Sequence, residues 1–329
     1  MTTATRLRFG ALLTLGSVLA GCVPSQPGLI PSGDRQAVPW MAKGLKGYDL
    51  LYVTNKNGAV NVYKYLKHTL VGVLTDFRWP IGACADYAGN VYVTDWEANK
   101  IVEYAHGGTK PIETIRDQFA PSNCSVNPVN GDLAVANYGN LNNRYRPGNI
   151  FIYARGKGKP VKYEGNDGEK FQGCAYDDRG DLLAAGAFGI SGPFYTNFYY
   201  LPKLSKSMEP MDLPGPSNSW EWGGIRGLAW DGKYWVVDSG DLYRYSINVK
   251  AQYVDKIVLS DFVPDIWIYR KGRKSPATQI VGANGTYTTR SNDANVFYWN
   301  YPAGGSPIGT ITKGLDAPVG ITVSLKTGT

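Results

Sequence analysis

The sequence is poor in the features on which many enzymes and membrane-spanning proteins depend. Its 329 residues include only two histidines and four cysteines, and only 19% of them are charged. No phosphate-binding loop or dinucleotide-binding glycine motif stands between a predicted strand and a predicted helix. Helical periodicity is almost absent, and apart from residues 9–19 no apolar run approaches the length of a membrane span. We therefore expect a β-rich fold without a mature membrane helix and without nucleotide chemistry.

Charge of one sign is not concentrated anywhere in the chain. The net charge is +7, which becomes +5 once Arg6 and Arg8 leave with the predicted signal peptide, and no block of lysines or arginines occurs. Such a mild excess suits anionic lipid or glycan surfaces better than a nucleic acid. We therefore expect no nucleic-acid partner.

The N-terminus has the form of a signal peptide that ends in a lipid-attachment site. Arg6 and Arg8 supply a positive region, and the apolar run at 9–19 is too short for a comfortable mature span. The run leads into Leu19-Ala20-Gly21-Cys22, which resembles a bacterial lipobox. The alternative is an ordinary secretory peptide with a chance cysteine, but small residues directly before the cysteine favour the lipobox. We predict a signal peptide over 1–21 and lipidation of Cys22.

Lipidation would place the protein in the bacterial cell envelope, anchored to the membrane. Val23 follows the cysteine, rather than the aspartate associated with inner-membrane retention, which favours the outer membrane over the inner one. Residues 22–46 contain four prolines among polar residues and are predicted to form a flexible tether. Within this tether, Trp40 and Met41 could dock on the domain that follows.

A strand–turn–strand pattern recurs along residues 47–329. Its most complete copy, at 80–95, is two short strands joined by an Asp-x-x-Gly-Asn turn, and a third strand is predicted at 100–104. Degraded copies follow at a period of roughly 40–50 residues, which is typical of β-propellers. The copies begin near residues 80, 121, 171, 225, 263 and 318. The pattern predicts an all-β fold.

The two ends of the repeat region are incomplete in complementary ways. Residues 318–324 form a predicted inner strand with no strand after it, whereas 50–55 and 59–63 are a second and a third strand with no inner strand before them. Joining the ends completes one blade and removes the exposed edges of the sheet. We predict a six-bladed propeller over 47–329, closed by pairing the C-terminal inner strand with the N-terminal strands.

The copy at 80–99 resembles the NHL repeat, in the pattern Pro-x-Gly-x-x-Ala-Asp-x-x-Gly-Asn-Val-Tyr-Val-Thr-Asp-x-x-x-Asn. The pattern is clear at 171–186 and 225–245 and fainter at 121–153, where Asn123 replaces the inner-strand glycine. The resemblance implies six blades. It also implies that the loops before inner strands and between second and third strands share one face, which we call the loop-rich face. It implies no single chemistry, because some NHL proteins bind protein or RNA and neighbouring propeller families include lactonases and lyases.

The longest predicted loops lie on the loop-rich face of adjacent blades. They cover 137–147, 186–197 and 214–224 and are rich in aromatic, amide and arginine side chains. Such side chains suit sugars or peptides, although they could instead pack on one another to order the loops. We therefore predict a protein or polysaccharide ligand on this face. The candidate ligand-binding residues are Trp79, Trp96, Glu97, Tyr138, Asn142, Arg144, Arg146, Phe188, Tyr195, Trp220, Glu221, Trp222 and Arg226.

Carboxylate and amide side chains end the second strands of three copies. Asp95, Asn137 and Asp238 could ring the channel mouth and hold Ca²⁺ through their oxygen atoms. Residues of these types also end strands by bonding their own backbone, and we favour that interpretation. We expect no cofactor and no metal, with Ca²⁺ as the alternative. An enzymatic alternative is a Ca²⁺-dependent hydrolase similar to lactonases or lyases, with carboxylates drawn from Glu97, Glu221, Asp238 and Asp241.

The two histidines are predicted to lie away from the loop-rich face. His68 and His106 each follow a tyrosine of a third strand, so both fall in turns on the opposite face. This placement disfavours a histidine-dependent lyase, a histidine-ligated zinc site and a Ser/His/Asp arrangement at the loop-rich face.

Three cysteines remain after Cys22. Cys84 and Cys124 could meet between the second and third blades, but inner strands are often too far apart for the Cα separation of about 4.4–6.8 Å that a disulfide needs. We therefore favour small buried thiols at all three positions, Cys174 included.

Together these features predict a lipid-anchored, monomeric envelope lipoprotein. It would act as a non-catalytic binding or scaffold module through the loop-rich face.

Overall fold

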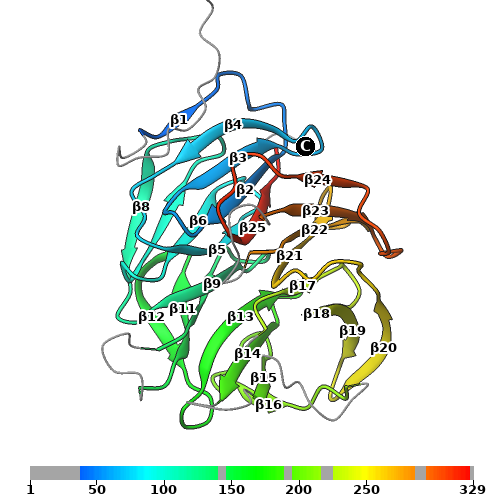
Figure 1. The fold of residues 1–329 in the computed structure, drawn as a ribbon. Coiled ribbons are helices and arrows are strands. Elements are labelled where there is room, and N and C mark those ends of the chain that lie inside the picture. Colours follow the sequence, from blue (N-terminus) through cyan, green and yellow to red (C-terminus); the bar gives the residue numbers. More distant parts are fainter. Residues whose placement is uncertain (1–37, 140–145, 189–194, 216–224, 286–293, 327–329) are drawn as a thin grey trace, which may run out of the picture. The chain divides into compact units, whose positions relative to one another are not determined.

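Six antiparallel sheets make up the part of the chain that the computed structural model describes, which is residues 38–139, 146–188, 195–215, 225–285 and 294–326 (Figure 1). These residues belong to one compact unit, Gln36–Thr329. They contain strands, turns and bends but no helix, and hence no helix that could cross a bilayer. The all-β prediction is confirmed.

Each sheet is one blade, whose strands run in order from the inner to the outer edge. Blade 1 contains β25 (Pro318–Ser324), β2 (Leu50–Asn55), β3 (Val60–Lys64), β4 (Thr69–Leu74) and β1 (Trp40–Met41). Blade 2 contains β5 (Pro80–Ala85), β6 (Val91–Asp95), β7 (Lys100–Tyr104) and β8 (Pro111–Arg116). Blade 3 contains β9 (Pro121–Val126), β10 (Leu133–Asn137), β11 (Asn149–Ala154) and β12 (Lys157–Tyr163).

The remaining three blades have four strands each. Blade 4 contains β13 (Lys170–Tyr176), β14 (Leu182–Phe188), β15 (Tyr195–Leu201) and β16 (Glu209–Met211). Blade 5 contains β17 (Leu228–Trp230), β18 (Trp235–Ser239), β19 (Asp241–Ile247) and β20 (Ala251–Ile257). Blade 6 contains β21 (Asp265–Arg270), β22 (Ala277–Ala283), β23 (Val296–Asn300) and β24 (Gly309–Ile311).

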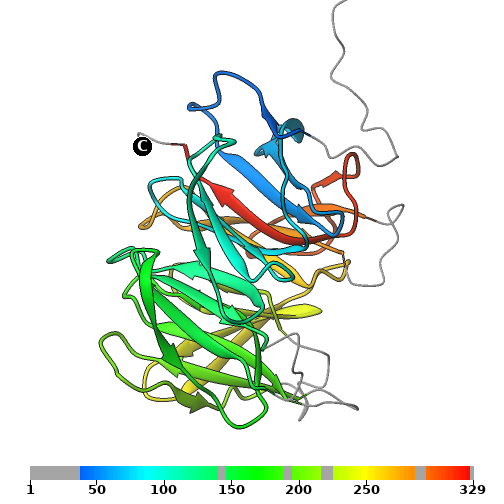
Figure 2. The same ribbon diagram turned by 90° about the vertical axis from the view of Figure 1, so that its left-hand side faces the viewer.

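The inner strands form a ring. They contact one another in the order β25, β5, β9, β13, β17 and β21, and β21 contacts β25 again. The C-terminal strand β25 pairs antiparallel with β2, with Leu50 opposite Ser324. The red C-terminal strand accordingly lies beside a blue N-terminal strand in both views (Figures 1 and 2). The predicted six blades and their closure through the two ends of the chain are confirmed.

Trp40 and Met41, which the sequence places in the tether, add a fifth strand to blade 1. They form β1 and pair with Val73 and Gly72 of β4. A Cβ atom at Gly72 would collide with the Met41 thioether, so a larger residue there would have to displace this side chain. The contacts of the propeller therefore extend back to residue 40.

Alternation along the strands places the hydrophobic core between the blades. In β2, Leu50 and Tyr52 pack against blade 2, whereas Leu51 and Val53 pack against blade 6. Each of the six gaps between neighbouring blades holds one such cluster of buried side chains. Since burying one large apolar side chain contributes about 1.5–3 kcal/mol, the clusters hold the ring together.

The inner-strand glycines lie where neighbouring blades approach most closely. A Cβ atom at Gly82 would lie 2.7 Å from the Cα atom of Asn123, and one at Gly320 would overlap the carbonyl oxygen of Ile81. The glycine of the repeat is thus a packing requirement at the channel wall, because only glycine lets two backbones come this close.

A disulfide joins blades 2 and 3, which corrects the expectation of free thiols at these positions. Cys84 of β5 and Cys124 of β9 are bonded, with their Cα atoms 5.6 Å apart. The same close approach that requires Gly82 brings the two strands within disulfide distance. Cys174 is the small buried thiol that the sequence predicts, and burial raises its pKa to about 12.

Candidate functional site

Antiparallel pairing gives every blade two ends and the propeller two faces. The loop-rich face carries the loops before the inner strands and those between second and third strands. The opposite face, which we call the short-turn face, carries the turns after the inner strands and after the third strands. The turn at 86–90 shows why these turns are tight: the Asp86 side chain accepts the backbone N–H of Asn90 at 2.7 Å, and Gly89 adopts a φ of 90°.

A channel of about 140 Å³ runs between the inner strands. Its wall is mostly small and apolar, with Ala83 and Ala175 among the lining residues. Asp265 lies at the loop-rich end, since it begins β21, whereas Asp178 and Arg270 lie at the short-turn end. The channel therefore has an ionisable group at its loop-rich end and a charged pair at its short-turn end.

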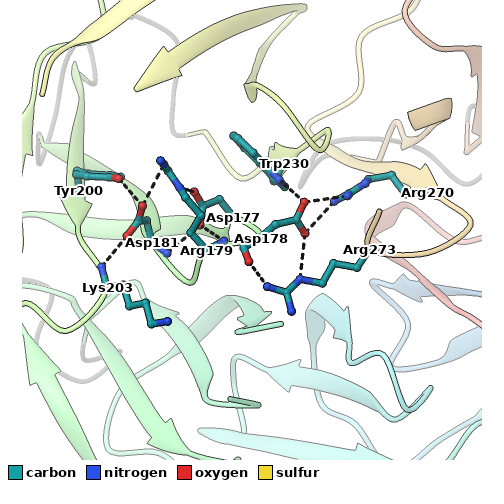
Figure 3. Close-up of polar contacts among 9 residues, drawn as sticks. All are labelled: Asp177, Asp178, Arg179, Asp181, Tyr200, Lys203, Trp230, Arg270 and Arg273. Carbon is teal, nitrogen blue, oxygen red and sulfur yellow. Dashed lines mark hydrogen bonds and ion pairs between the residues drawn. The ribbon is translucent and has the colours of Figure 1, made fainter. Parts of the chain in front are cut away.

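Asp178 is the centre of a polar network at the short-turn mouth (Figure 3). It lies in the turn between β13 and β14 and accepts two hydrogen bonds from Arg270, at 3.1 and 2.8 Å. The indole N–H of Trp230 donates to the same carboxylate at 2.9 Å. Figure 3 shows the carboxylate of Asp178 between these two partners. Blades 4, 5 and 6 are thus tied together by one carboxylate.

Arg273 extends this network across the ring. It donates to the carbonyl oxygen of Pro128 at 3.2 Å. It also donates to the carbonyl oxygen of Asp178, and its Nε atom lies 3.9 Å from the Asp178 carboxylate (Figure 3). Pro128 belongs to blade 3, which is opposite blade 6 in the ring. Tyr87 of blade 2 feels the same charges, because Arg270 and Arg273 oppose the rise that burial causes in its pKa. Five blades therefore contribute to this mouth, and the sequence did not predict the network.

Three of the predicted binding residues meet on the loop-rich face. The rings of Trp79 and Trp96 pack edge to face at 4.9 Å, and Tyr138 packs on Trp96 at 5.7 Å. Asp95 fixes the loop before β5, since its carboxylate accepts the backbone N–H groups of Arg78 and Trp79 at 3.0 and 2.9 Å. The three rings are half-buried, so they pack on one another and still present surface to solvent.

Phe188 and Tyr195 are strand residues rather than loop residues, which corrects the predicted loop at 186–197. β14 continues to Phe188 and β15 begins at Tyr195, and the two residues pair across the strands. Their exposed fractions are 48% and 52%, so both residues lie largely in solvent at paired strand ends.

The other predicted binding residues differ in their surroundings. Glu97 and Arg146 are exposed, and the Arg146 carbonyl oxygen accepts a hydrogen bond from Lys170. Arg226 is buried beneath the loop-rich face, where its carbonyl oxygen accepts the Asn123 side chain at 3.2 Å. Outside the described residues lie Cys22, Asn142, Arg144, Trp220, Glu221 and Trp222.

Two buried carboxyl groups lie near the loop-rich end of the channel. Burial raises the pKa of Asp265 to about 7, against the attraction of Arg226, and the Ile321 N–H donates to it at 3.1 Å. Burial also raises the pKa of Asp238 well above its ordinary value, with the charge of Asp265 adding to the rise. Burial therefore favours the neutral acid form of both groups.

The three weak metal candidates each have a partner in their own blade. Asp95 accepts the two N–H groups before β5, Asn137 donates to Asn149 at 3.0 Å, and Asp238 accepts the Gly240 N–H at 3.0 Å. These contacts match the expected strand-ending role. Across the described ranges, no group of three or more His, Cys, Asp or Glu side chains has the spacing of a metal site.

Both histidines lie on the short-turn face, as predicted. His106 follows β7, and its Nδ1 atom is 2.7 Å from the hydroxyl of Ser324. His68 precedes β4 and stacks on Tyr298 with 4.4 Å between ring centres. Partial burial lowers the pKa of both rings. The contact of His106 therefore joins blade 2 to blade 1, and that of His68 joins blade 1 to blade 6.

Comparisons with known proteins identify the fold. No protein-family model and no curated protein matches the chain, so the NHL resemblance stays a prediction. A chain in the crystal structure of a nidogen/laminin complex is similar, with a TM-score of 0.60 and 13% identity over 85% of this chain and 100% of that one. Hydrazine synthase of Kuenenia stuttgartiensis is similar with a TM-score of 0.57 and 12% identity, over 77% of this chain and 81% of that one. A functionally unknown protein of Desulfotomaculum acetoxidans is similar with a TM-score of 0.57 and 12% identity, over 84% of this chain and 99% of that one. At such low identity these likenesses show a shared propeller fold and leave function to be argued from the sites.

Proposed function

We propose that this protein is a non-catalytic binding module of the bacterial envelope. It holds a protein or polysaccharide on its loop-rich face and is anchored, as a monomer, through lipid on Cys22, in the outer rather than the inner membrane. The propeller is the scaffold, because a ring of blades keeps loops from several sheets in fixed positions on one face.

The exposed aromatic pair Phe188 and Tyr195 carries the proposal. Two rings about half exposed on paired strand ends offer large contact areas to a sugar ring or a peptide. A Cβ atom at Gly168 would lie 2.9 Å from the Phe188 ring, so that ring rests directly on backbone. Such fixed, solvent-facing aromatics are typical of binding surfaces.

Neighbouring blades add to this aromatic surface. Trp79 and Trp96 of blade 2 pack with Tyr138 of blade 3. The ammonium group of Lys170, at the start of blade 4, lies 5.9 Å from the centre of the Tyr138 ring. Blades 2, 3 and 4 thus adjoin through aromatic and cationic groups, a combination that suits both glycans and protein surfaces.

Two of the four carboxylates of the enzymatic alternative, Asp238 and Asp241, are engaged in other contacts. Asp241 pairs with Lys256 at 2.8 Å on the exposed side of blade 5, and Asp238 is buried against its own blade. We therefore favour binding over carboxylate chemistry for the loop-rich face.

Loss of the aromatic pair is expected to weaken partner binding strongly. In the full chain, Phe188→Ala with Tyr195→Ala should lower the amount bound to purified peptidoglycan sacculi, or the amount of specific envelope proteins recovered, at least about tenfold relative to the wild type. The reason is that both proposed contact rings are removed. The measurement is co-sedimentation with sacculi and affinity purification from envelope extract. Tyr253→Ala is the matched control, since Tyr253 is 42% exposed on the outer strand of blade 5. Equal binding by the double variant and the control would refute the loop-rich face as the site.

Substitution of Cys22 is expected to release the protein from the membrane. Without the thiol no acyl chain can be attached, and each buried CH₂ group of such a chain contributes about 0.8 kcal/mol to anchoring. Cys22→Ser should move the chain from the membrane pellet to the soluble fraction, and mass spectrometry of the wild type should find an acylated N-terminal cysteine. Cys174→Ala is the control. A Cys22→Ser chain that stays in the pellet would contradict the anchor.

A further inference from the structure

We propose that a cleft between blades 5 and 6, on the short-turn face, is a second site that binds an acidic polysaccharide segment. The cleft has a volume of about 970 Å³ and lies between the turn after β17, the turn after β21 and the residues that follow β23. The proposed ligand face is on the other side of the propeller, so this site is independent of it. We call it the blade 5–6 cleft.

Two arginines are held rigidly in the wall of this cleft. Arg244 binds the Asp255 carboxylate with two nitrogen atoms, the Nε contact being 2.6 Å, and Arg270 binds Asp178 in the same two-pronged way. Their side chains are only 14% and 9% exposed. Gly232 makes room for this arrangement, because its missing Cβ would lie 3.1 Å from the Arg270 guanidinium. The cleft therefore has preorganised cationic walls.

A tyrosine and an aspartate complete the base of the cleft. The Tyr301 hydroxyl donates to Asp231 and accepts a hydrogen bond from Arg244 at 3.3 Å. Asp231 also accepts the backbone N–H groups of Lys233 and Tyr234, at 2.7 and 2.6 Å. These bonds order the turn after β17 and fix the backbone position of Lys233.

The cleft carries more positive charge than its own carboxylates can neutralise. Five lysine and arginine residues and two aspartates line it, and with Asp255, which binds Arg244 from behind the wall, the net charge is +2. The two aspartates are engaged with Arg270 and Arg244. Lys233 and Lys274 are exposed, and within the described part of the chain no carboxylate lies at ion-pair distance from either. These two lysines, on neighbouring blades, are therefore available to an anion.

The shape and lining of the cleft favour an anionic sugar chain over other anions. Charges spread across two blades match several negative groups along a chain rather than one compact phosphate. Among the described lining residues there is no Leu, Ile, Val, Met, Phe or Trp, so neither an acyl chain nor a peptide anchor finds an apolar pocket. Tyr234 and Tyr301 offer phenol rings and hydroxyls, which suit sugar rings. The shared chemistry is a polysaccharide that bears carboxylate or phosphate groups.

The test compares charge reversal in the cleft with charge reversal elsewhere. Lys233→Glu with Lys274→Glu in the full chain should weaken binding of polygalacturonate or phosphomannan at least about tenfold, measured by biolayer interferometry at low salt. The control, Lys157→Glu with Lys159→Glu, makes the same change in net charge at exposed positions on the outer strand of blade 3 and should change binding less than about twofold. Melting temperatures of both double variants confirm that they are folded.

Further probes decide the ligand class. Polygalacturonate reports on carboxylates, phosphomannan on phosphates and neutral dextran on sugar alone, and binding of dextran equal to that of the acidic chains would overturn the proposal. Three other results would also overturn it. They are equal losses of affinity in the cleft variant and the control, tighter binding of polyglutamate than of either acidic polysaccharide, and no binding of the acidic polysaccharides by the wild type. The Phe188→Ala and Tyr195→Ala chain should keep its affinity for the acidic polysaccharide, so failure of this site and failure of the loop-rich face are distinguishable.

Discussion

Loss of the disulfide between Cys84 and Cys124 is expected to lower the free energy of unfolding by about 4 kcal/mol. The bond closes a loop of 40 residues that contains most of blade 2, so it removes much conformational freedom from the unfolded chain. It also ties together two inner strands beside the channel. The measurement is urea unfolding of the double variant Cys84→Ala and Cys124→Ala against the wild type, both without reductant.

Two controls isolate the effect of the covalent bond. Adding reductant should destabilise the wild type towards the level of the double variant and leave the double variant unchanged. Cys174→Ala removes a buried sulfur atom that is not bonded, and should cost only about 1 kcal/mol for the small cavity. If the double variant loses no more than Cys174→Ala, the bond contributes nothing beyond packing, and the prediction is wrong.

The disulfide also shows how far the sequence could lead. The repeat at 80–95 defines a blade, and its copies give the number of blades and the closure of the ring, because period-2 alternation and turn residues are local signals. The distance between Cys84 and Cys124 is not a local signal. It depends on a register shift between Pro80 and Ala83 and on the close approach at Gly82, which arise only when neighbouring blades pack.

The mouth on the short-turn face was missed for a related reason. Asp178 and Arg270 are 92 residues apart, and no local pattern pairs them. One signal was available: the residue after the inner strand is Asp86 in blade 2 and Asp177 in blade 4, whereas blade 6 has Lys271 there, directly after Arg270. A basic residue at a repeated acidic position is a departure that points to a local charge partner. The repeat can therefore be used to find sites by its substitutions as well as by its longer loops.

On the loop-rich face, the sequence predicted the placement of the aromatic side chains better than that of the charged ones. Trp79, Trp96 and Tyr138 meet as neighbours because each lies directly beside a strand end whose place in the repeat was known. Arg226 lies in the same stretch of the repeat, yet it is buried and its charge is felt by Asp265. Whether a charge near a strand end turns outward or inward depends on the partner across the channel, which comes from another blade.

The buried carboxyl of Asp265 is expected to make stability fall as pH rises. Its pKa is about 7 in the folded protein against 3.8 as the ordinary value, so between these values the folded state keeps a proton that the unfolded state releases. The free energy of the unfolded state therefore falls relative to that of the folded state as pH rises through this window. Stability from this group is greatest below about pH 4, declines until about pH 7 and is level above it. Between pH 5 and pH 8 the loss should be about 3 kcal/mol.

Asp265→Asn is the variant that isolates this group, because the amide stays neutral and its oxygen can still accept the Ile321 N–H. Urea unfolding of both proteins at pH 5 and pH 8 gives the measurement, and the wild type should lose about 3 kcal/mol more than the variant between the two pH values. The pKa of Asp238 is also raised, in part by the charge of Asp265, so the difference between the two proteins measures Asp265 together with its coupling to Asp238. Equal pH dependence in the two proteins would show that Asp265 is ionised throughout, held so by Arg226. The buried end of the channel would then be a permanent ion pair, whereas loss of the dependence in the variant identifies it as a group that titrates close to neutral pH.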